Sequence, residues 1–382
     1  MPPLLTDEQE AIQSAVREFA ENEIEPVARE HDEEKKYPHE LVRRAAEYDF
    51  AATMVPGEYG GAGLDMLSSA LVTEELWRAD PGIASAISAV AFSGVVKIIE
   101  KYGDEWMKEE WFPKFASAEA LTCIAISEPA HGSDVANIET TATRDDDEWV
   151  INGNKMWITN ATVADVAVLM AKTDPDAGHR GISAFLVPSD TAGFNPHKID
   201  NKLGMNAADL GEIVLDDVCI PEDHILGEEN EGFYYLMDTL SKPSRVSVSA
   251  QAVGTAQGAL DAALEYAQER EQFGQSIGDF QAIQHKLAEM ATRTSAARSL
   301  TQLAALYTMD DHEMASQMAS MSKLYTSETA VDVTDKAIQV HGAAGYVSDH
   351  PVERYYRDAR VFKIYEGTSE IQKNIISKTL LQ

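Results

Sequence analysis

The hydrophobic period of the chain changes twice, and this pattern restricts the possible folds more than any single motif does. Apolar residues recur at helical spacing over about residues 6–118. They give way to short runs rich in Val, Ile, Thr and aromatic residues up to about residue 221, and the helical spacing returns after Gly232. Helices followed by strands and then by helices, without βαβ alternation, argue against a doubly wound sheet. We therefore predict a mainly α chain with a central β domain: an N-terminal helical domain over 1–120, a β-barrel-like domain over 121–230 and a C-terminal four-helix bundle over 231–382.

Capping residues and turn signals divide these three parts into elements. Thr6 can cap a first helix and Pro38 can open another. Asn152-Gly153-Asn154 is a turn signal between two strands. The other predicted helices cover 66–77, 83–102, 246–270, 280–307, 314–340, 351–360 and 368–380, and the predicted strands cover 121–126, 148–151, 156–159, 166–171, 182–187 and 212–218. No GxGxxG or GxxxxGK motif follows any of these strands, so a nucleotide held on a Rossmann or P-loop element is not expected.

The chain is strongly acidic. Its 64 Asp and Glu residues against 31 Lys and Arg residues give a formal net charge of −33. Such a surface repels phosphodiester backbones and anionic lipids, so we expect neither nucleic-acid nor membrane partners. Because the excess is spread along the chain, it indicates adaptation to a salt-rich, halophilic cytosol, where ions screen the self-repulsion. An ordinary acidic protein is the alternative.

Cysteine usage and the N-terminal residues bear on location. Cys123 and Cys219 lie far apart in the chain, so neither a disulfide framework nor a CxxC metal or redox site is available. The first residues lack a basic segment followed by an apolar one, and no run of about 18 apolar residues occurs. We therefore expect a soluble, cytoplasmic protein without a metal site.

Three polar, turn-rich stretches between apolar runs are candidates for a functional site: 127–134, 339–346 and 365–370. A Gly-Ser or Gly-Thr pair in such a loop lets backbone N–H groups approach a ligand closely, while the hydroxyl donates to a phosphate or ring oxygen. Taken one at a time, each stretch is as well explained by a plain turn or by a helix cap, with Ser133 or Thr368 as the N-cap residue.

Six motifs follow one another in order over about 250 residues. They are Ser127-Glu128-Pro129 with Gly132-Ser133-Asp134, the segment NGNKMWITN at 152–160, Arg270-Glu271-Gln272-Phe273-Gly274, Gln339 with His341-Gly342 and Gly345-Tyr346, Arg357-Asp358-Ala359-Arg360, and IYEGTSEIQ at 364–372. Together they strongly resemble the acyl-CoA dehydrogenase family, and the resemblance spans the full length of the chain. The helical, β, helical architecture of that family agrees with the periodicity.

The resemblance implies that FAD is the cofactor and that an acyl-CoA thioester is the substrate. Glu366 falls where most members keep the base that removes the α-proton, while the β-hydrogen leaves as a hydride to the flavin. A carboxyl group suits this task because desolvation raises its pKa. The thioester carbonyl would accept hydrogen bonds from the backbone N–H of Glu366 and from a ribityl hydroxyl of FAD, which stabilises enolate character. Electrons would then pass to an electron-transfer flavoprotein.

The resemblance also implies where the ligands bind. Trp157 would lie beside the flavin ring and Thr159 near its N5 atom. Arg270 would reach the pyrophosphate of an FAD held by a neighbouring subunit, which implies a homo-oligomer, usually a tetramer in this family. The residues predicted to bind FAD are Ile124, Ile126, Ser127, Gly132, Ser133, Trp157, Ile158, Thr159 and Thr368, with Arg270, Phe273, Gln281, Gln339 and Gly342 acting across the subunit interface; Ser133, Arg245 and Gly367 are predicted to lie close to the acyl-CoA.

Some positions depart from the patterns of particular family members. Branched-chain and long-chain members that carry their base on another helix need a Glu at position 244, which is Ser244 here. Glutaryl-type members carry an Arg near position 84, and Ala84 there favours a monocarboxylic chain. Ala130-His131 replaces a common Gly-Ala pair. A short- to medium-chain acyl-CoA is the predicted substrate. The alternatives are an oxidase-like flavoenzyme, a branched-chain or dicarboxylic substrate, and a non-enzymatic interaction protein on the same fold.

Overall fold

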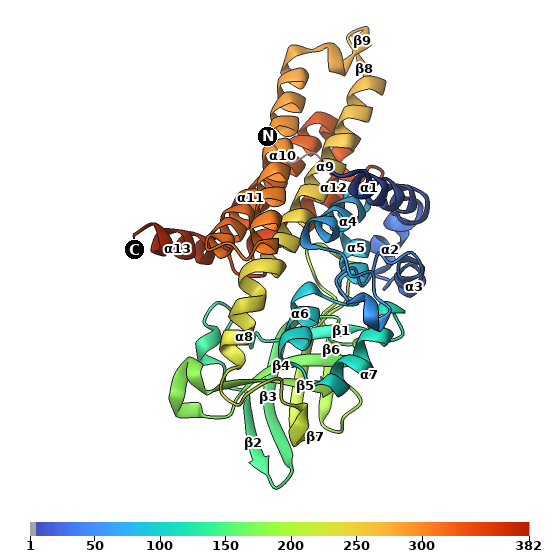
Figure 1. Ribbon diagram of the computed structural model, residues 1–382. Coiled ribbons are helices and arrows are strands. Elements are labelled where there is room, and N and C mark those ends of the chain that lie inside the picture. The colour runs from blue at the N-terminus through green and yellow to red at the C-terminus, as the bar shows by residue number, and fades with distance from the viewer. Residues whose placement is uncertain (1–4, 382) are drawn as a thin grey trace.

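The computed structural model describes residues 5–381 as three successive parts, and the first is helical (Figure 1). Thr6 caps the first helix as predicted. Its hydroxyl accepts a hydrogen bond from the N–H of Gln9 at 3.2 Å, and the Gln9 side chain accepts one from the N–H of Thr6 at 3.1 Å. The helices of this part are α1 (Asp7–Phe19), α2 (Ala28–Glu34), α3 (His39–Glu47), α4 (Met66–Ala79), α5 (Pro81–Ser88), α6 (Ser93–Tyr102) and α7 (Glu105–Ala116).

The single helix predicted over 83–102 is wrong, because two helices share this stretch. α5 ends at Ser88 and α6 begins at Ser93. By length and composition, the stretch Pro81–Tyr102 could cross a membrane, since its most apolar window has a mean hydropathy of 1.9. However, 72% of that window is buried inside the protein, as is typical of a core helix.

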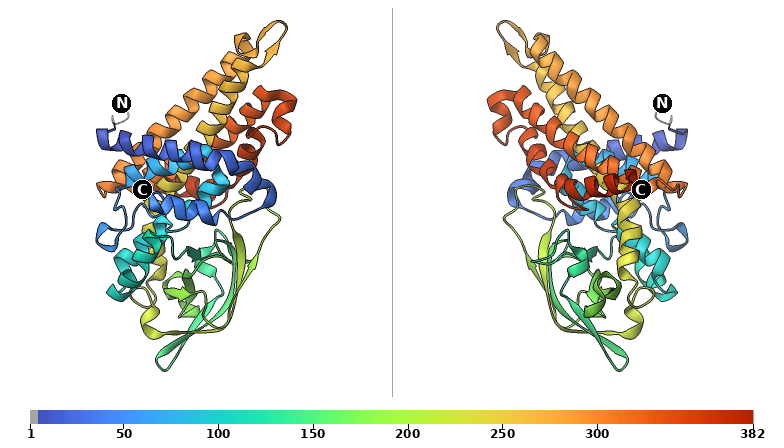
Figure 2. Two further views of the ribbon diagram at one scale, coloured as in Figure 1. Left: turned by 90° about the vertical axis from the view of Figure 1, so that its right-hand side faces the viewer. Right: turned by 90° about the vertical axis from the view of Figure 1, so that its left-hand side faces the viewer.

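The second part is one seven-stranded sheet with the strand order β1-β4-β2-β3-β7-β6, in which β5 also pairs with β4. The sheet curls without closing (Figure 2), so the predicted barrel-like domain is a half-barrel. Two of its strands, β2 and β6, were not predicted. The strands are β1 (Thr122–Ala125), β2 (Thr141–Asp145), β3 (Glu148–Thr159), β4 (Val166–Lys172), β5 (Ile182–Pro188), β6 (Phe194–Lys198) and β7 (Leu210–Pro221).

The turn predicted at Asn152-Gly153-Asn154 is also wrong. β3 runs through this triplet as one long strand paired with β7. The pairing shifts register twice, once at the triplet and once between Lys155 and Ile158. Such bulges let a strand absorb residues that a regular ladder cannot pair, and they turn side chains in new directions. The second shift contains Trp157, which belongs to the site described below.

The third part is helical again. α9, α10 and α11 pack against one another, α4 of the first part packs on α9, and α13 packs on α11. The α9–α10 hairpin projects away from the sheet and ends in the short strands β8 and β9 (Figures 1 and 2). The elements are α8 (Gly232–Thr239), α9 (Arg245–Glu269), β8 (Glu271–Gln272), β9 (Gln275–Ser276), α10 (Gln281–Met309), α11 (Ala315–His341), α12 (Val352–Ala359) and α13 (Ser369–Leu380).

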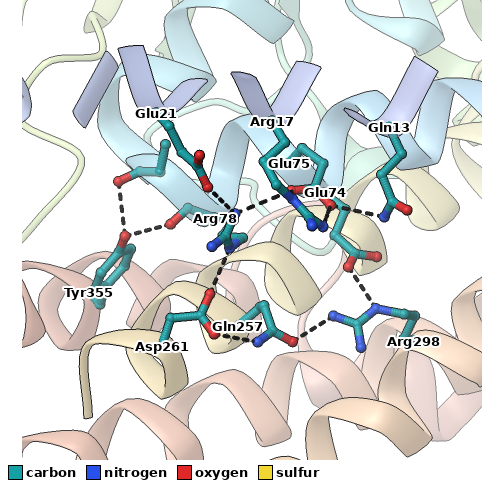
Figure 3. A network of polar contacts seen from close by, with 11 residues as sticks. Gln13, Arg17, Glu21, Glu74, Glu75, Arg78, Gln257, Asp261, Arg298 and Tyr355 are labelled. Carbon is teal, nitrogen blue, oxygen red and sulfur yellow. Dashed lines mark hydrogen bonds and ion pairs between the residues drawn. The ribbon is translucent and has the colours of Figure 1, made fainter. Parts of the chain in front are cut away.

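A network of ion pairs joins the two helical parts (Figure 3). Glu74 and Glu75, adjacent on α4, are both buried, and each is paired with an arginine from another helix. The pairs are Arg298–Glu74, Arg17–Glu75 and Arg78–Asp261, with N···O distances of 2.7, 2.7 and 2.6 Å. The two glutamates are buried, but their arginines are partly exposed, Arg17 to 46% and Arg298 to 28%, so solvent screens each pair from one side. Arg298–Glu74 and Arg78–Asp261 join α4 to the C-terminal bundle, whereas Arg17–Glu75 joins it to α1, and α4 forms part of the site.

The folded chain should lose stability when salt is removed. Its net charge of −33 creates repulsion between carboxylates, and the Debye length grows from about 3 Å at 1 M salt to about 10 Å at 0.1 M. We expect the melting temperature to fall as KCl is lowered between these limits, with sucrose at matched osmolality as the uncharged control. A melting temperature that is indifferent to KCl would contradict salt adaptation.

Candidate active site

A cavity of about 390 Å³ lies where the three parts of the fold meet. One wall comes from the sheet, another from α4, α5 and the connection to α6, and a third from the segment before α13. The predicted residues that line it are Ile124, Ile126, Ser127, Gly132, Ser133, Trp157, Ile158, Thr159, Glu366, Gly367 and Thr368. Within residues 5–381, no group of three His, Cys, Asp or Glu side chains is placed to hold a metal ion.

Glu366 lies in a tight connection that leads into α13. Its φ is +53° and that of Gly367 is +85°, so two consecutive residues are left-handed. This conformation is uncommon for a non-glycine residue, and such strain persists where the surroundings hold it in place. Here Tyr365 donates a 2.5 Å hydrogen bond to a side chain of α9, and Thr368 caps the first turn of α13. The connection is thus held on both sides of Glu366.

The carboxyl group of Glu366 has few hydrogen bonds for a buried group. Among residues 5–381, its Oε2 atom is buried without a hydrogen-bond partner. Burial raises the pKa of Glu366, while the nearby Ser244 hydroxyl and the charges of Lys323 and Arg245 oppose this shift. The group is therefore more basic than an exposed glutamate, and the two cations favour its ionised form.

Other buried polar atoms without partners belong to residues that contact or flank the segment of Glu366. In the described part of the chain they are Ser244 Oγ, Arg245 Nε, Ser369 Oγ and Gln372 Oε1. Native structures contain few such groups, and each calls for a ligand, a water or a functional reason. Arg245 does not line the cavity itself. It is buried behind Glu366, donates to Ser320 Oγ at 3.1 Å, and burial lowers its pKa to about 10. None of these four residues lines the cavity, so the cluster lies behind the cavity wall that Glu366 forms.

On the sheet side, a buried ion pair anchors the loop 127–134. Glu128 accepts hydrogen bonds from the N–H and the hydroxyl of Thr140, at 3.0 and 2.6 Å, and from the Lys155 ammonium at 2.8 Å. Lys155 also donates to the carbonyl of Ile126 at 3.1 Å. Glu128 belongs to the first of the six sequence motifs, but the sequence alone predicted no function for it. The structure shows that it holds the loop whose Gly132 and Ser133 line the cavity.

Trp157 occupies the second register shift of β3. Its φ is +64°, and its side chain is 58% exposed although it lines the cavity. A large exposed indole beside Ile124 and Ile126, with the hydroxyls of Ser127 and Thr159 on the same cavity, provides a flat apolar surface next to hydrogen-bonding groups. These residues fit the flavin ring of FAD.

Trp77 closes the cavity on the side of α4. The indole is 1% exposed, and its N–H donates to Ser88 Oγ at 3.3 Å. The ring lies 5.6 Å from that of Phe362, which lies 6.0 Å from that of Tyr365. A row of aromatic rings therefore connects this wall to the residue before Glu366.

The remaining predicted FAD residues do not reach the cavity within one chain. They are Arg270, Phe273, Gln281, Gln339 and Gly342. All five are exposed, Phe273 to 94%. They lie at the ends of α9, α10 and α11 that are remote from the sheet (Figure 1), where Tyr266 stacks on His341 with ring centroids 4.3 Å apart. The structure thus separates the predicted cofactor residues into two groups.

Three side chains near Glu366 were missed by the sequence analysis: Gln251 on α9, Lys323 on α11 and Gln372 on α13. Gln251 accepts the Tyr365 hydroxyl, and the other two donate to backbone carbonyls beside Glu366. All three are buried polar residues in long helices. The available signal was a polar residue on an apolar helical face, but that signal does not say what the residue contacts.

Known proteins resemble the chain in sequence and in fold. Residues 6–119, 123–218 and 230–381 match the N-terminal, middle and C-terminal domains of acyl-CoA dehydrogenase. The mitochondrial short-chain specific acyl-CoA dehydrogenase of Bos taurus is 40% identical over 380 residues, 99% of this chain and 91% of that protein.

Two solved structures share the fold over the whole length. Butyryl-CoA dehydrogenase from Megasphaera elsdenii has a TM-score of 0.96 at 35% identity, covering 100% of both chains. A chain from work on the electron transferring flavoprotein of Acidaminococcus fermentans has a TM-score of 0.96 at 38% identity, also covering 100% of both. The protein therefore belongs to the acyl-CoA dehydrogenase family and is an FAD-dependent dehydrogenase.

Proposed function

We propose that the protein oxidises a short, straight-chain acyl-CoA to the trans-2-enoyl-CoA, with Glu366 as the base and an electron-transfer flavoprotein as the acceptor. The observation that carries the proposal is the carboxyl group of Glu366. It has a raised pKa and an unpartnered Oε2 atom, and it lines the same cavity as Trp157. Similarity to a short-chain specific enzyme and to a butyryl-CoA dehydrogenase supports the substrate class. Similarity to the Acidaminococcus chain supports the acceptor.

The chemistry assigned to the chain is proton removal and charge stabilisation. Bound FAD would accept the β-hydrogen as a hydride. Glu366 would accept the α-proton, and the burial that raises its pKa makes it a stronger base than an exposed glutamate. Within residues 5–381 the backbone N–H of Glu366 has no acceptor, so it can donate to the thioester carbonyl. This hydrogen bond would stabilise the negative charge that develops on that oxygen.

Two features of the cavity favour a short monocarboxylic chain. Trp77 fills the space on the α4 side with a large, hydrogen-bonded ring. In addition, no Lys or Arg lines the cavity within the described residues, so a second carboxylate at the far end of the chain would be buried without a cation. The first feature limits length, and the second disfavours dicarboxylic substrates.

A chain-length series tests this proposal. Under argon, the flavin absorbance should bleach fastest with butyryl-CoA, more slowly with octanoyl-CoA and least with palmitoyl-CoA, and it should recover only slowly in air. Trp77→Phe should raise the octanoyl-to-butyryl ratio of kcat/KM by roughly tenfold or more, because each methylene in an apolar pocket is worth about 1–3 kcal/mol. Trp111→Phe on α7, remote from the cavity lining, is the matched control.

Other outcomes would contradict particular parts of the proposal. Rapid reoxidation by air would indicate an oxidase. A wild-type preference for palmitoyl-CoA would contradict the short-chain assignment. An unchanged ratio in Trp77→Phe would show that Trp77 does not limit chain length.

We extend the proposal to assembly and propose a cytoplasmic homotetramer. In it, five exposed residues at the end of the bundle contact the cofactor of a neighbouring chain; they are Arg270, Phe273, Gln281, Gln339 and Gly342. Phe273 supports this. It is a large apolar side chain, almost fully exposed, with a left-handed φ of +55°. Contiguous exposed apolar surface is typical of interaction sites, and Phe273 packs edge-on against Phe280 with ring centroids 6.0 Å apart.

A further inference from the structure

Lys323 is a buried lysine without a buried carboxylate as its partner. It lies on α11, its side chain is 0% exposed, and its Nζ donates to the carbonyl oxygen of Gly367 at 2.7 Å. Within residues 5–381 no carboxylate lies within ion-pair distance of Nζ, although other buried cations of this chain, such as Lys155, have one. Burying a charge without a partner is costly, so a structural or functional reason is expected.

The carbonyl that Lys323 contacts belongs to the strained connection at Glu366. Glu366 and Gly367 are both left-handed, with φ values of +53° and +85°. Gln372 from α13 also donates to their two carbonyls, at 3.2 and 3.0 Å. Gln372 therefore holds the carbonyls of both residues, and Lys323 holds that of Gly367 from a different helix. A Cβ atom at Gly367 would lie 2.7 Å from Gln372 Nε2 and would be strained at a φ of +85°, so a larger residue would have to displace the Gln372 side chain.

We propose that Lys323 is a positioning residue for the base: its ammonium group holds the carbonyl of Gly367, the residue after Glu366, and thereby fixes where the carboxyl group and N–H of Glu366 point. This inference rests on the role proposed for Glu366. Lys323 does not line the cavity, so it acts through the backbone rather than on the substrate. A displacement of about 1 Å in a catalytic group can cost about a hundredfold in rate.

The same contact has an electrostatic consequence. The groups that face Glu366 are Ser244, Arg245 and Lys323, and those that face Lys323 are Glu366, Arg245 and Glu370. Burial lowers the pKa of Lys323 to about 8, so it is mostly charged at neutral pH and loses its charge as the pH rises through that value. Its positive charge lowers the pKa of Glu366. Removing Lys323 should therefore raise the pKa of Glu366.

Two substitutions separate the hydrogen bond from the charge. In Lys323→Met, the methionine is close to lysine in shape but has neither the hydrogen-bond donor nor the charge. Lys323→Gln keeps a donor on a shorter side chain and lacks the charge. Lys336→Met is the control, because Lys336 lies on the same helix about 20 Å further along and pairs with Asp332 at 2.6 Å. Each holoenzyme is assayed for flavin per chain, melting temperature, kcat, KM and the pH profile of kcat/KM with butyryl-CoA.

We expect Lys323→Met to keep its flavin and to lose about tenfold to hundredfold in kcat with little change in KM. The acidic limb of its pH profile should move up by about one unit. Lys323→Gln should show the same pH shift with a smaller loss of kcat. A wild-type kcat and pH profile in Lys323→Met would overturn the inference. So would an equal loss in Lys336→Met, or a loss fully explained by missing flavin.

A further variant distinguishes this inference from the proposed function. If Glu366→Gln retains activity, the role proposed for Glu366 has failed. If Glu366→Gln is inactive while Lys323→Met matches the wild type, the base is correct and only the positioning role is wrong.

Discussion

Glu366→Gln should keep the fold and the flavin but lose dehydrogenation. The amide is nearly isosteric with the carboxyl group, so the left-handed connection and its contacts with Lys323 and Gln372, which involve backbone carbonyls, are unaffected. An amide cannot accept the α-proton, and a general base typically contributes about 10²- to 10⁴-fold. We therefore expect kcat to fall by about that factor, measured by anaerobic bleaching of the flavin with butyryl-CoA.

Glu370→Gln provides the matched control. Glu370 lies four residues after Glu366 in the first turn of α13, is exposed and is absent from the cavity lining. It should retain near-wild-type turnover. If Glu366→Gln retains most of the activity, or if both variants lose it equally, the base is not Glu366.

The wild type should also show the pH dependence of a buried base. Burial raises the pKa of Glu366, and only the ionised carboxylate can accept the α-proton. Its kcat/KM should therefore fall as the pH drops through this raised pKa, and the acidic limb should be missing from the residual activity of Glu366→Gln.

The sequence was most informative where one local signal decides a local structure. The change from helical to strand period marks the three parts of the fold because each period of apolar residues fits only one kind of element. Thr6 caps α1 because the capping box needs only residues three apart. Two of the three loop stretches, 127–134 and 365–370, line one cavity because each lies at the end of a regular element.

The sequence was misleading where contacts with neighbouring elements determine the local structure. Asn152-Gly153-Asn154 predicts a turn. However, β3 pairs with β7 both before and after this triplet, which keeps the strand extended, and the residues that cannot pair form bulges. Residues 83–102 were predicted to form one helix, but the helix is interrupted between α5 and α6, where Ala89 and Phe92 line the cavity. Nothing in the sequence links Lys323 to Glu366 until the connection 365–368 is placed against α11.

The two groups of predicted cofactor residues show a third limit, because one chain does not bring them together. In the described structure, Arg270 and Phe273 lie at the tip of the bundle, and the cavity lies near the sheet. A cofactor that contacts both groups must be shared between chains.

Arg270→Ala should therefore weaken FAD binding and assembly together. The Arg270 side chain is exposed in the single chain, so it is available to a neighbour. A charge-assisted contact with the pyrophosphate is worth about 1.5–3 kcal/mol, or roughly ten- to hundredfold in FAD affinity. By linkage, the FAD that holds two chains together also stabilises the oligomer. We expect the variant to purify partly without flavin, with a larger dissociated fraction on size exclusion that added FAD reverses.

Arg293→Ala removes the same charge from an exposed position on α10 and serves as the control, since its guanidinium lies 3.3 Å from Asp332. It should remain fully yellow and elute as the wild type does. If Arg270→Ala loses flavin without dissociating, Arg270 contacts a cofactor that its own chain holds, and the assembly does not depend on that contact. If Arg270→Ala is fully yellow and its elution is unchanged, Arg270 is an ordinary surface residue and the pyrophosphate is bound elsewhere.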